Sequence, residues 1–153
     1  MKKIKKFIII IFISILLLFG CNKNENTKNT NIIDNSNREI DTMKMVINDK
    51  EYVVNLEKNE TVNYFVNLLP QEFKMSELNG NEKYVYLDEK LPTNAYNPKH
   101  INSGDVMLYG NNCLVVFYKS FDTSYSYTKI GHIDNLPDLG NENINVKIFE
   151  WGN

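Results

Sequence analysis

Hydrophobic and polar residues alternate with a period of two through most of the chain beyond residue 42. Met43, Met45 and Ile47 alternate with polar residues, and the alternation resumes beyond a polar turn at 48–50. Successive side chains of a strand point to opposite faces, so this pattern predicts a β-hairpin with one buried face. Similar patterns predict further strands over residues 73–75, 84–87, 105–109, 113–118, 125–133 and 144–148.

The period changes to that of a helix between residues 59 and 70. Apolar residues there recur at the i, i+3, i+4 and i+7 positions of one helix face, namely Val62, Phe65, Val66 and Leu69. Asn59 is a suitable N-cap and Pro70 cannot continue a helix, so we expect the helix to lie between them. We interpret its apolar stripe as core and not as a ligand-binding surface.

Residues 104–133 contain most of the aromatic side chains that could line a site. Strands 105–109 and 113–118 flank a glycine-containing turn and are predicted to form a hairpin. Every residue from 114 to 117 is apolar, which indicates a strand buried on both faces. Cys113 begins this strand and has no histidine and acid pair near it in sequence. We therefore interpret Cys113 as a core residue and not as a nucleophile.

Residues 88–103 show no hydrophobic period and contain two prolines. A loop of this length inside a small domain is usually functional or mobile. Its polar and aromatic side chains could close over a neighbouring cavity; they include Asn94, Tyr96 and His100. The whole pattern predicts a mainly β domain, a closed barrel of about eight strands with one or two short helices, because antiparallel sheets remove their edges by closing.

Residues 1–20 have the features of a secretory signal. Four lysines precede an apolar run, 7–19, that is too short to cross a hydrocarbon core of about 30 Å as a helix. The run ends in Leu18-Phe19-Gly20-Cys21, which resembles the bacterial lipobox. The resemblance implies that a diacylglyceryl group is attached to Cys21 and anchors the protein, by two acyl chains such as palmitate, on the extracytoplasmic side of the cell membrane. The alternative is an ordinary cleaved signal peptide with an incidental cysteine.

Residues 21–42 are rich in Asn, Thr, Lys and Ser and contain few large apolar side chains. Such a segment buries too little surface to offset the entropy lost on ordering. We therefore expect the lipidated cysteine to be followed by a disordered tether, and a single folded domain to span 43–153.

From Met43 onward the chain carries ten lysines and no arginine against fifteen acidic residues, a balance of −5. A surface of this sign repels phosphate backbones, so we expect no nucleic-acid partner. His100 and His132 each lie near one acidic residue, Asp105 and Asp134, but neither shows the spacing of metal ligands. We therefore predict no metal site and no cofactor.

Four stretches of the predicted domain resemble the small bacterial cyclophilin-like proteins, a family of compact β-barrels. These stretches are Leu78-Asn79-Gly80-Asn81-Glu82-Lys83-Tyr84, Leu91-Pro92-Thr93-Asn94-Ala95, Gly104-Asp105-Val106-Met107-Leu108-Tyr109-Gly110, and Ser124-Tyr125-Ser126-Tyr127-Thr128 before Ile130-Gly131. The resemblance extends over essentially the whole domain. It implies the closed cyclophilin-like barrel that the strand pattern also favours.

True cyclophilins are peptidyl-prolyl isomerases, and the resemblance lets their catalytic groups be compared one by one. That family uses an arginine to weaken the amide resonance of the X-Pro bond. The only arginine of this chain is Arg38, in the predicted tether. Tyr127 stands where the resemblance implies a histidine, and Phe117 corresponds to the phenylalanine of the proline pocket. Because one group of three is kept, we do not expect catalysis.

We expect instead a binding module for a peptide or a small molecule. An aromatic pocket at the barrel mouth would be lined by Phe117, Tyr109, Tyr125 and Tyr127, with hydrogen bonds from Asn81, Asn94 and Ser126. Two alternatives stay open: isomerisation of prolyl bonds in secreted proteins, and a scaffold for other extracytoplasmic proteins that binds no small ligand. Phe117 and two of the tyrosines could equally be plain core residues.

Overall fold

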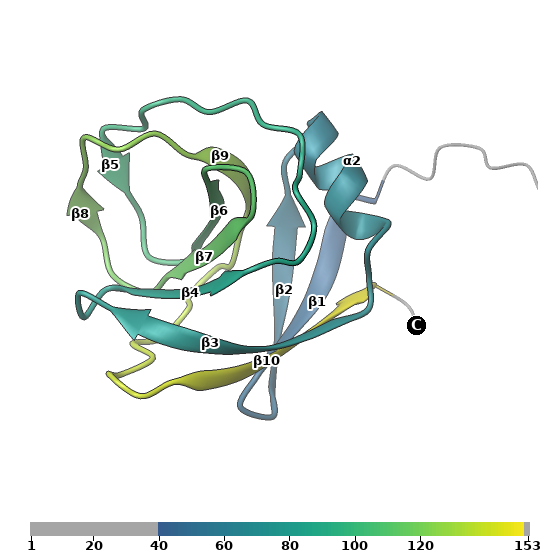
Figure 1. Ribbon diagram of the computed structural model, residues 1–153. Helices are drawn as coiled ribbons and strands as arrows, with labels where there is room; N and C mark the ends of the chain where they lie inside the picture. The colour runs from purple at the N-terminus through teal and green to yellow at the C-terminus, as the bar shows by residue number, and fades with distance from the viewer. Residues whose placement is uncertain (1–39, 152–153) are drawn as a thin grey trace, which may run out of the picture. The chain divides into compact units, whose positions relative to one another are not determined.

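Eight strands within residues 40–151, the part of the chain that this computed structural model describes, close into one antiparallel barrel (Figure 1). They are β1 (Thr42–Ile47), β2 (Lys50–Leu56), β3 (Gln71–Leu78), β4 (Glu82–Tyr86), β6 (Asp105–Tyr109), β7 (Cys113–Phe117), β9 (Thr128–His132) and β10 (Ile144–Glu150). Their order is β1-β10-β3-β4-β7-β6-β9-β2, and β2 pairs with β1 to close the barrel. The predicted fold class is confirmed. The predicted signal peptide, Cys21 and the tether up to residue 39 lie outside the described residues.

The β1–β2 hairpin shows how local sequence sets the register of the barrel. Asn48 and Asp49 take φ values of 45° and 68°, the left-handed conformation that a two-residue hairpin turn requires. The turn pairs Ile47 with Lys50. This register directs alternate residues of β1 inward, and Met45 is fully buried as the period-two pattern predicts.

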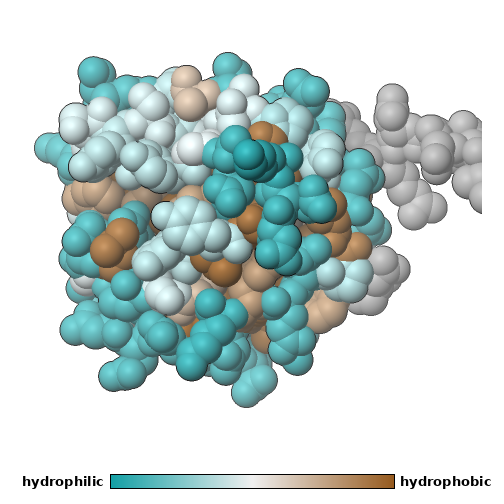
Figure 2. Space-filling model, viewed as in Figure 1, coloured by the Kyte–Doolittle hydropathy of each residue, from teal (hydrophilic) through white to brown (hydrophobic). Residues whose placement is uncertain are grey.

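Aliphatic and methionine side chains fill the barrel interior. The large and fully buried members of this inner cluster include Met43, Met45, Met75, Leu108, Leu114 and Ile130. On the face shown in Figure 2, hydrophilic and intermediate residues cover most of the surface, and hydrophobic ones are visible in gaps between them. The inner cluster therefore accounts for the stability of the barrel, because burial of apolar surface is the dominant favourable term in folding.

The helix α2 (Glu60–Val66) lies beside one end of β1 and β2 (Figure 1) and adds its apolar face to the inner cluster. Asn59 caps it as predicted, and its Oδ1 accepts a hydrogen bond from the Val62 N–H at 2.9 Å. The helix ends at Val66, earlier than predicted, because the N–H groups of Leu68 and Leu69 donate to carbonyls three residues back and tighten the last turn. No helix in the described part of the chain is long and apolar enough to cross a membrane.

The strand β7 carries apolar side chains on both faces, as its sequence predicts, and each face belongs to a different cluster. Leu114 and Val116 point into the barrel and join the inner cluster. The side chains at positions 113, 115 and 117 point the other way, because alternate residues of a strand reach opposite sides of a sheet. They form an outer cluster of Ile101, Met107, Cys113, Val115, Phe117 and Tyr127.

Two segments cover part of the outer face of β6 and β7. β5 (His100–Ile101) pairs with β8 (Phe121–Asp122) in a small second sheet. Strands of two residues are too short to show a hydrophobic period, so the sequence did not predict this sheet. Tyr96 exchanges both backbone hydrogen bonds with Tyr127, at 3.0 and 2.9 Å. Residues 88–99 have no regular secondary structure apart from this bridge, as expected, but the bridge at Tyr96 fastens them to the barrel. Tyr127 forms only this bridge, and β9 begins at Thr128. The predicted strand from residue 125 is therefore wrong in its first three residues.

Two glycines mark places where segments of backbone come too close together for a side chain. A Cβ on Gly131 would lie 2.4 Å from the carbonyl oxygen of Asn55, where β9 meets β2. A Cβ on Gly104, which has a φ of +96°, would lie 2.1 Å from the carbonyl oxygen of Ile133. Both positions therefore require glycine, which gives a physical reason for their place among the residues that carry the family resemblance.

A buried lysine ties the β3–β4 hairpin to the segment before β10. Lys83 is fully buried, and its Nζ donates to Glu77 Oε2 at 2.6 Å and to the carbonyl oxygens of Gly140 and Glu142 at 2.6 and 2.8 Å. The Tyr118 hydroxyl donates to the same carboxylate oxygen at 2.8 Å. Burial raises the pKa of Glu77, but the hydrogen bonds from Lys83 and Tyr118 outweigh it and leave that pKa below its ordinary value. Glu77 is therefore ionised and its charge is satisfied.

Candidate ligand-binding site

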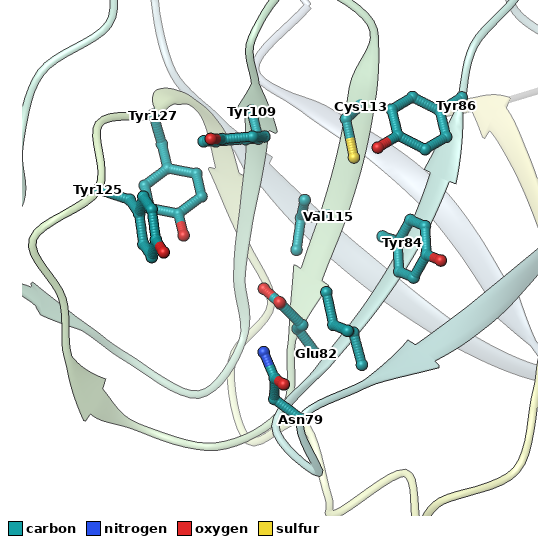
Figure 3. A pocket seen from close by; sticks show the side chains of 10 residues that line it. Asn79, Glu82, Tyr84, Tyr86, Tyr109, Cys113, Val115, Tyr125 and Tyr127 are labelled. Carbon is teal, nitrogen blue, oxygen red and sulfur yellow. The ribbon is translucent and has the colours of Figure 1, made fainter.

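A pocket of about 300 Å³ lies on the outer face of the barrel wall, over β4, β7 and β6 (Figure 3). It is lined by Leu78, Asn79, Glu82, Tyr84, Tyr86, Tyr109, Cys113, Val115, Tyr125 and Tyr127. Its position differs from the expected one at the barrel mouth, because the residues that line it point away from the filled interior. Its volume is at the lower end of the range usual for small-ligand sites.

The pairing of β4 with β7 builds the floor and one wall. Tyr84 lies opposite Val115, and Tyr86 lies opposite Cys113. Glu82 points to the same side as these tyrosines, since residues two apart in a strand share a face. Cys113 and Val115 are buried and form the floor, and Tyr84 and Tyr86 stand beside it with ring centroids 5.9 Å apart. In Figure 3 the Glu82 carboxylate lies between this pair of rings and the tyrosines of the opposite wall.

Three further tyrosines form the opposite wall. The ring centroid of Tyr109 lies 6.1 Å from that of Tyr125 and 5.6 Å from that of Tyr127. Tyr109 and Tyr125 are 45% and 61% exposed, whereas Tyr127 is buried. Figure 3 shows the rings of Tyr109 and Tyr125 edge-on, with their faces turned to the space beside Val115. A ligand that enters this space would meet aromatic rings on two sides.

Phe117 lies beneath the wall and does not line the pocket. Its fully buried ring packs edge-on against Tyr127, with centroids 5.5 Å apart and planes at 90°. On another side it contacts Phe121, also at 5.5 Å. Phe117 therefore supports the position of Tyr127, and a ligand in this pocket would lie above Tyr127 without touching Phe117.

Glu82 gives the pocket an acidic group with an unusual proton affinity. Burial, with a smaller contribution from the negative charge of Glu77, raises the pKa of Glu82 from 4.5 to about 7. Burial and then the charge of Glu82 raise the pKa of the Cys113 thiol, and the same two causes in the same order raise the pKa of Tyr127. Cys113 is thus kept protonated, which agrees with its interpretation as a core residue, although it also lines the pocket floor.

Of the seven side chains predicted to form the site, Tyr109, Tyr125 and Tyr127 line the pocket together. The three predicted hydrogen-bonding residues lie elsewhere. The side-chain oxygen of Asn81 is buried and has no hydrogen-bond partner among the described residues, and Ser126 is exposed and does not line the pocket. Asn94 borders a separate hollow of about 330 Å³, whose other lining residues are Glu57, Lys58, Asn59, Tyr96, Thr128 and Lys129.

Sequence reasoning missed the wall that β4 provides. The predicted strand 84–87 placed Tyr84 and Tyr86 on one face but left out Glu82, which belongs to β4 in the structure. The sequence pattern does not indicate which strands pair with β4. β4 pairs with β7 and β3, and the pairing with β7 spans the whole of residues 88–112. Without that long-range pairing, nothing brought Glu82 to the tyrosines of the 109–127 region.

Both histidines pair with carboxylates. His100 Nδ1 lies 2.7 Å from Asp122 Oδ1, and His132 Nδ1 lies 3.0 Å from Asp105 Oδ1. Within residues 40–151, no group of three histidine, cysteine or acidic side chains is arranged to hold a metal ion. We therefore interpret these pairs as parts of the scaffold: one joins β5 to β8, and the other joins β6 to β9.

Comparison with known proteins supports the architecture just described. Residues 45–149 match the model of a family described as the cyclophilin-like family. The fold is similar to that of a hypothetical protein from Archaeoglobus fulgidus whose structure was solved in solution, with a TM-score of 0.50 and 18% sequence identity over 75% of this chain and 98% of that one. No protein of curated function is significantly similar to the chain.

Proposed function

The chain belongs to the cyclophilin-like family, and from that premise we propose that its barrel is a ligand-binding module held by a lipid on Cys21 at the extracytoplasmic face of the membrane. The observation that carries the proposal is the open pocket of about 300 Å³ on β4, β7 and β6, walled by five tyrosines. Mostly apolar hollows with a few polar groups are the usual form of small-ligand and peptide sites. The ligand is a small molecule or a short peptide segment.

Binding is favoured over prolyl isomerisation by the groups that surround the pocket. The chain beyond residue 38 contains no arginine to donate hydrogen bonds around a prolyl amide. A lysine offers a point charge without the planar fork of a guanidinium, and no lysine lines the pocket. Phe117, the retained member of the isomerase set, is covered by Tyr127. A protease-coupled assay on an Ala-Pro peptide is expected to show no acceleration, and acceleration that Phe117→Ala removes would instead establish the isomerase.

Ligand binding is tested by thermal unfolding of the full-length protein with proline-containing peptides and a set of small metabolites. A true ligand is expected to raise Tm, because a compound that binds the folded state alone stabilises it. Tyr109→Ala should remove the shift. Tyr64→Ala is the matched control, since Tyr64 is exposed to a similar extent, 42%, on α2. A shift that survives Tyr109→Ala would place the ligand elsewhere, and a panel without any shift would contradict the proposed function.

The membrane anchor is tested separately, by growing cells with an alkyne analogue of palmitate and detecting the labelled protein. The chain has two cysteines, so Cys21→Ser should abolish labelling and transfer the protein from the membrane to the soluble fraction. Cys113→Ser is the matched control and should leave both unchanged, since Cys113 is buried in the barrel wall. Labelling that persists in Cys21→Ser would show that the sequence at 18–21 is not a lipobox.

A further inference from the structure

The pocket combines aromatic rings with a single acidic group. Its ten lining side chains include five tyrosines and the Glu82 carboxylate, and they include no lysine, arginine or histidine. Aromatic rings present a negative quadrupole at their faces, so a cation held against them is attracted electrostatically. A carboxylate between two groups of such rings adds a full negative charge to the same space (Figure 3).

Glu82 has no cationic partner of its own. Among the described residues, no lysine or histidine forms an ion pair with its carboxylate, whereas the nearby Glu77 is bound by Lys83 at 2.6 Å. A partly buried carboxylate without a counter-charge is costly to ionise. Burial, and then the negative charge of Glu77, raise the pKa of Glu82 to about 7, and no cation among the described residues offsets them. The β3–β4 hairpin thus carries two glutamates within six residues: Glu77, which has a cationic partner, and Glu82, which has none among the described residues.

We propose that the pocket binds an alkylammonium group, with the tyrosine rings around its alkyl substituents and the Glu82 carboxylate as its counter-charge. The inference rests on the proposed function and specifies the chemical class of its ligand. The rings favour a bulky, weakly hydrated cation, since such a cation loses little solvation when it leaves water. Anionic ligands are disfavoured by Glu82 and by the excess of acidic residues in the domain.

Binding of the cation is coupled to the loss of a proton. An ammonium group beside Glu82 stabilises the ionised carboxylate, so the bound state favours release of the proton that the free pocket holds below pH 7. Affinity should therefore rise with pH and level off above about pH 8. A neutral ligand of the same shape should show the opposite or no pH dependence, because it gains nothing from the charge.

The test measures binding of choline and of dimethylbutanol, its uncharged carbon isostere, to the full-length protein in non-ionic detergent by calorimetry. At pH 8 we expect choline to bind at least about tenfold more tightly than the isostere, in line with the strength of desolvated cation–π contacts. From pH 8 to pH 6 the choline affinity should fall about tenfold, since the ionised fraction of a group with a pKa near 7 falls by that factor. A peptide with one trimethyllysine, measured in parallel, distinguishes a protein-borne ammonium group from a free one.

Two variants complete the test. Glu82→Gln should reduce the choline affinity at pH 8 about tenfold or more and remove its pH dependence, while the affinity for the isostere is unchanged. Glu89→Gln is the matched control, because Glu89 is an exposed glutamate that does not line the pocket. Equal binding of choline and its isostere, or choline binding unaffected by Glu82→Gln, would overturn the inference. If neither cation binds but another compound of the earlier panel does so through Tyr109, this inference fails and the proposed function stands.

Discussion

The two faces of β7 have the same strand geometry and nearly the same burial, but they differ in what surrounds them. Leu114 and Val116 point into a closed interior of aliphatic side chains. Cys113 and Val115 point outward to a pocket bordered by tyrosines and a carboxylate. The same division holds on β4, where Lys83 points inward and is fully bonded while Glu82 points outward and has no cationic partner among residues 40–151.

This comparison shows how a small barrel can separate stability from binding without a second domain. Because neighbouring residues of one strand reach opposite sides of the wall, a ligand site can change on the outside while the packing inside stays constant. It also makes the two roles separable by experiment. Adjacent residues provide matched pairs, in which the inner member should affect the free energy of unfolding and the outer member should affect binding.

The largest effect is expected for Lys83→Met, which tests the polar end of the inner face. Removing the ammonium leaves the Glu77 carboxylate without its main partner and leaves the carbonyls of Gly140 and Glu142 unpaired, which should lower the free energy of unfolding by about 5 kcal/mol. Urea denaturation measures it. Lys147→Met is the control, because the Lys147–Glu72 pair is exposed and should contribute less than about 1 kcal/mol. A loss for Lys83→Met as small as that for Lys147→Met would show that the bonds of Lys83 do not stabilise the fold.

Next in size is the pair Leu114→Ala and Val115→Ala, adjacent residues on opposite faces of β7. Leu114→Ala opens a cavity in the closed interior and should cost about 2–5 kcal/mol. Val115→Ala removes two methyl groups beside a pocket that is already open, so it should cost about 1.5 kcal/mol from lost burial alone. Equilibrium unfolding of both variants in urea gives the comparison. Equal costs would mean that the outer face is as much a part of the core as the inner one.

The smallest effect is the pH dependence contributed by Glu82, because solvent screening at this half-buried carboxylate reduces the free energy that its raised pKa implies. Its pKa is raised in the folded protein, so the folded state binds the proton more tightly than the unfolded chain, and stability should fall as pH rises from about 4.5 to about 7. Glu77 has the opposite sign, because its pKa is lowered, and its contribution is lost only as pH falls below its ordinary value. Glu82→Gln should remove the pH dependence of stability between about pH 4.5 and 7 and leave the pH dependence below about pH 4.5 unchanged. Chemical denaturation from pH 3 to pH 8 separates the two, and a slope retained in Glu82→Gln would assign it to another group.

The fold was predictable from sequence because its signals are local. Alternation predicted most of the barrel strands, a continuous apolar run predicted β7, the turn at 48–50 predicted the first hairpin, and Asn59 predicted the start of the helix. The site depended on pairings between distant segments. The tyrosines at 109, 125 and 127 lie close enough in the chain to be grouped, whereas Glu82 reaches them only through the pairing of β4 with β7. Asn94 was misplaced because the β-bridge between Tyr96 and Tyr127 leaves no mark in the hydrophobic pattern.

The backbone pairing of Tyr96 with Tyr127 fixes the width of the pocket from a distance. Tyr127 cannot move outward without stretching its two backbone hydrogen bonds to Tyr96. The loop that carries Tyr96 is held at a second point, where the Thr61 hydroxyl on the helix donates to the carbonyl of Pro92 at 2.8 Å. The length of this loop, which does not line the pocket, therefore sets the position of the Tyr127 wall. Relatives in which residues 88–95 are longer or shorter should bind ligands of different width while they keep the same five tyrosines.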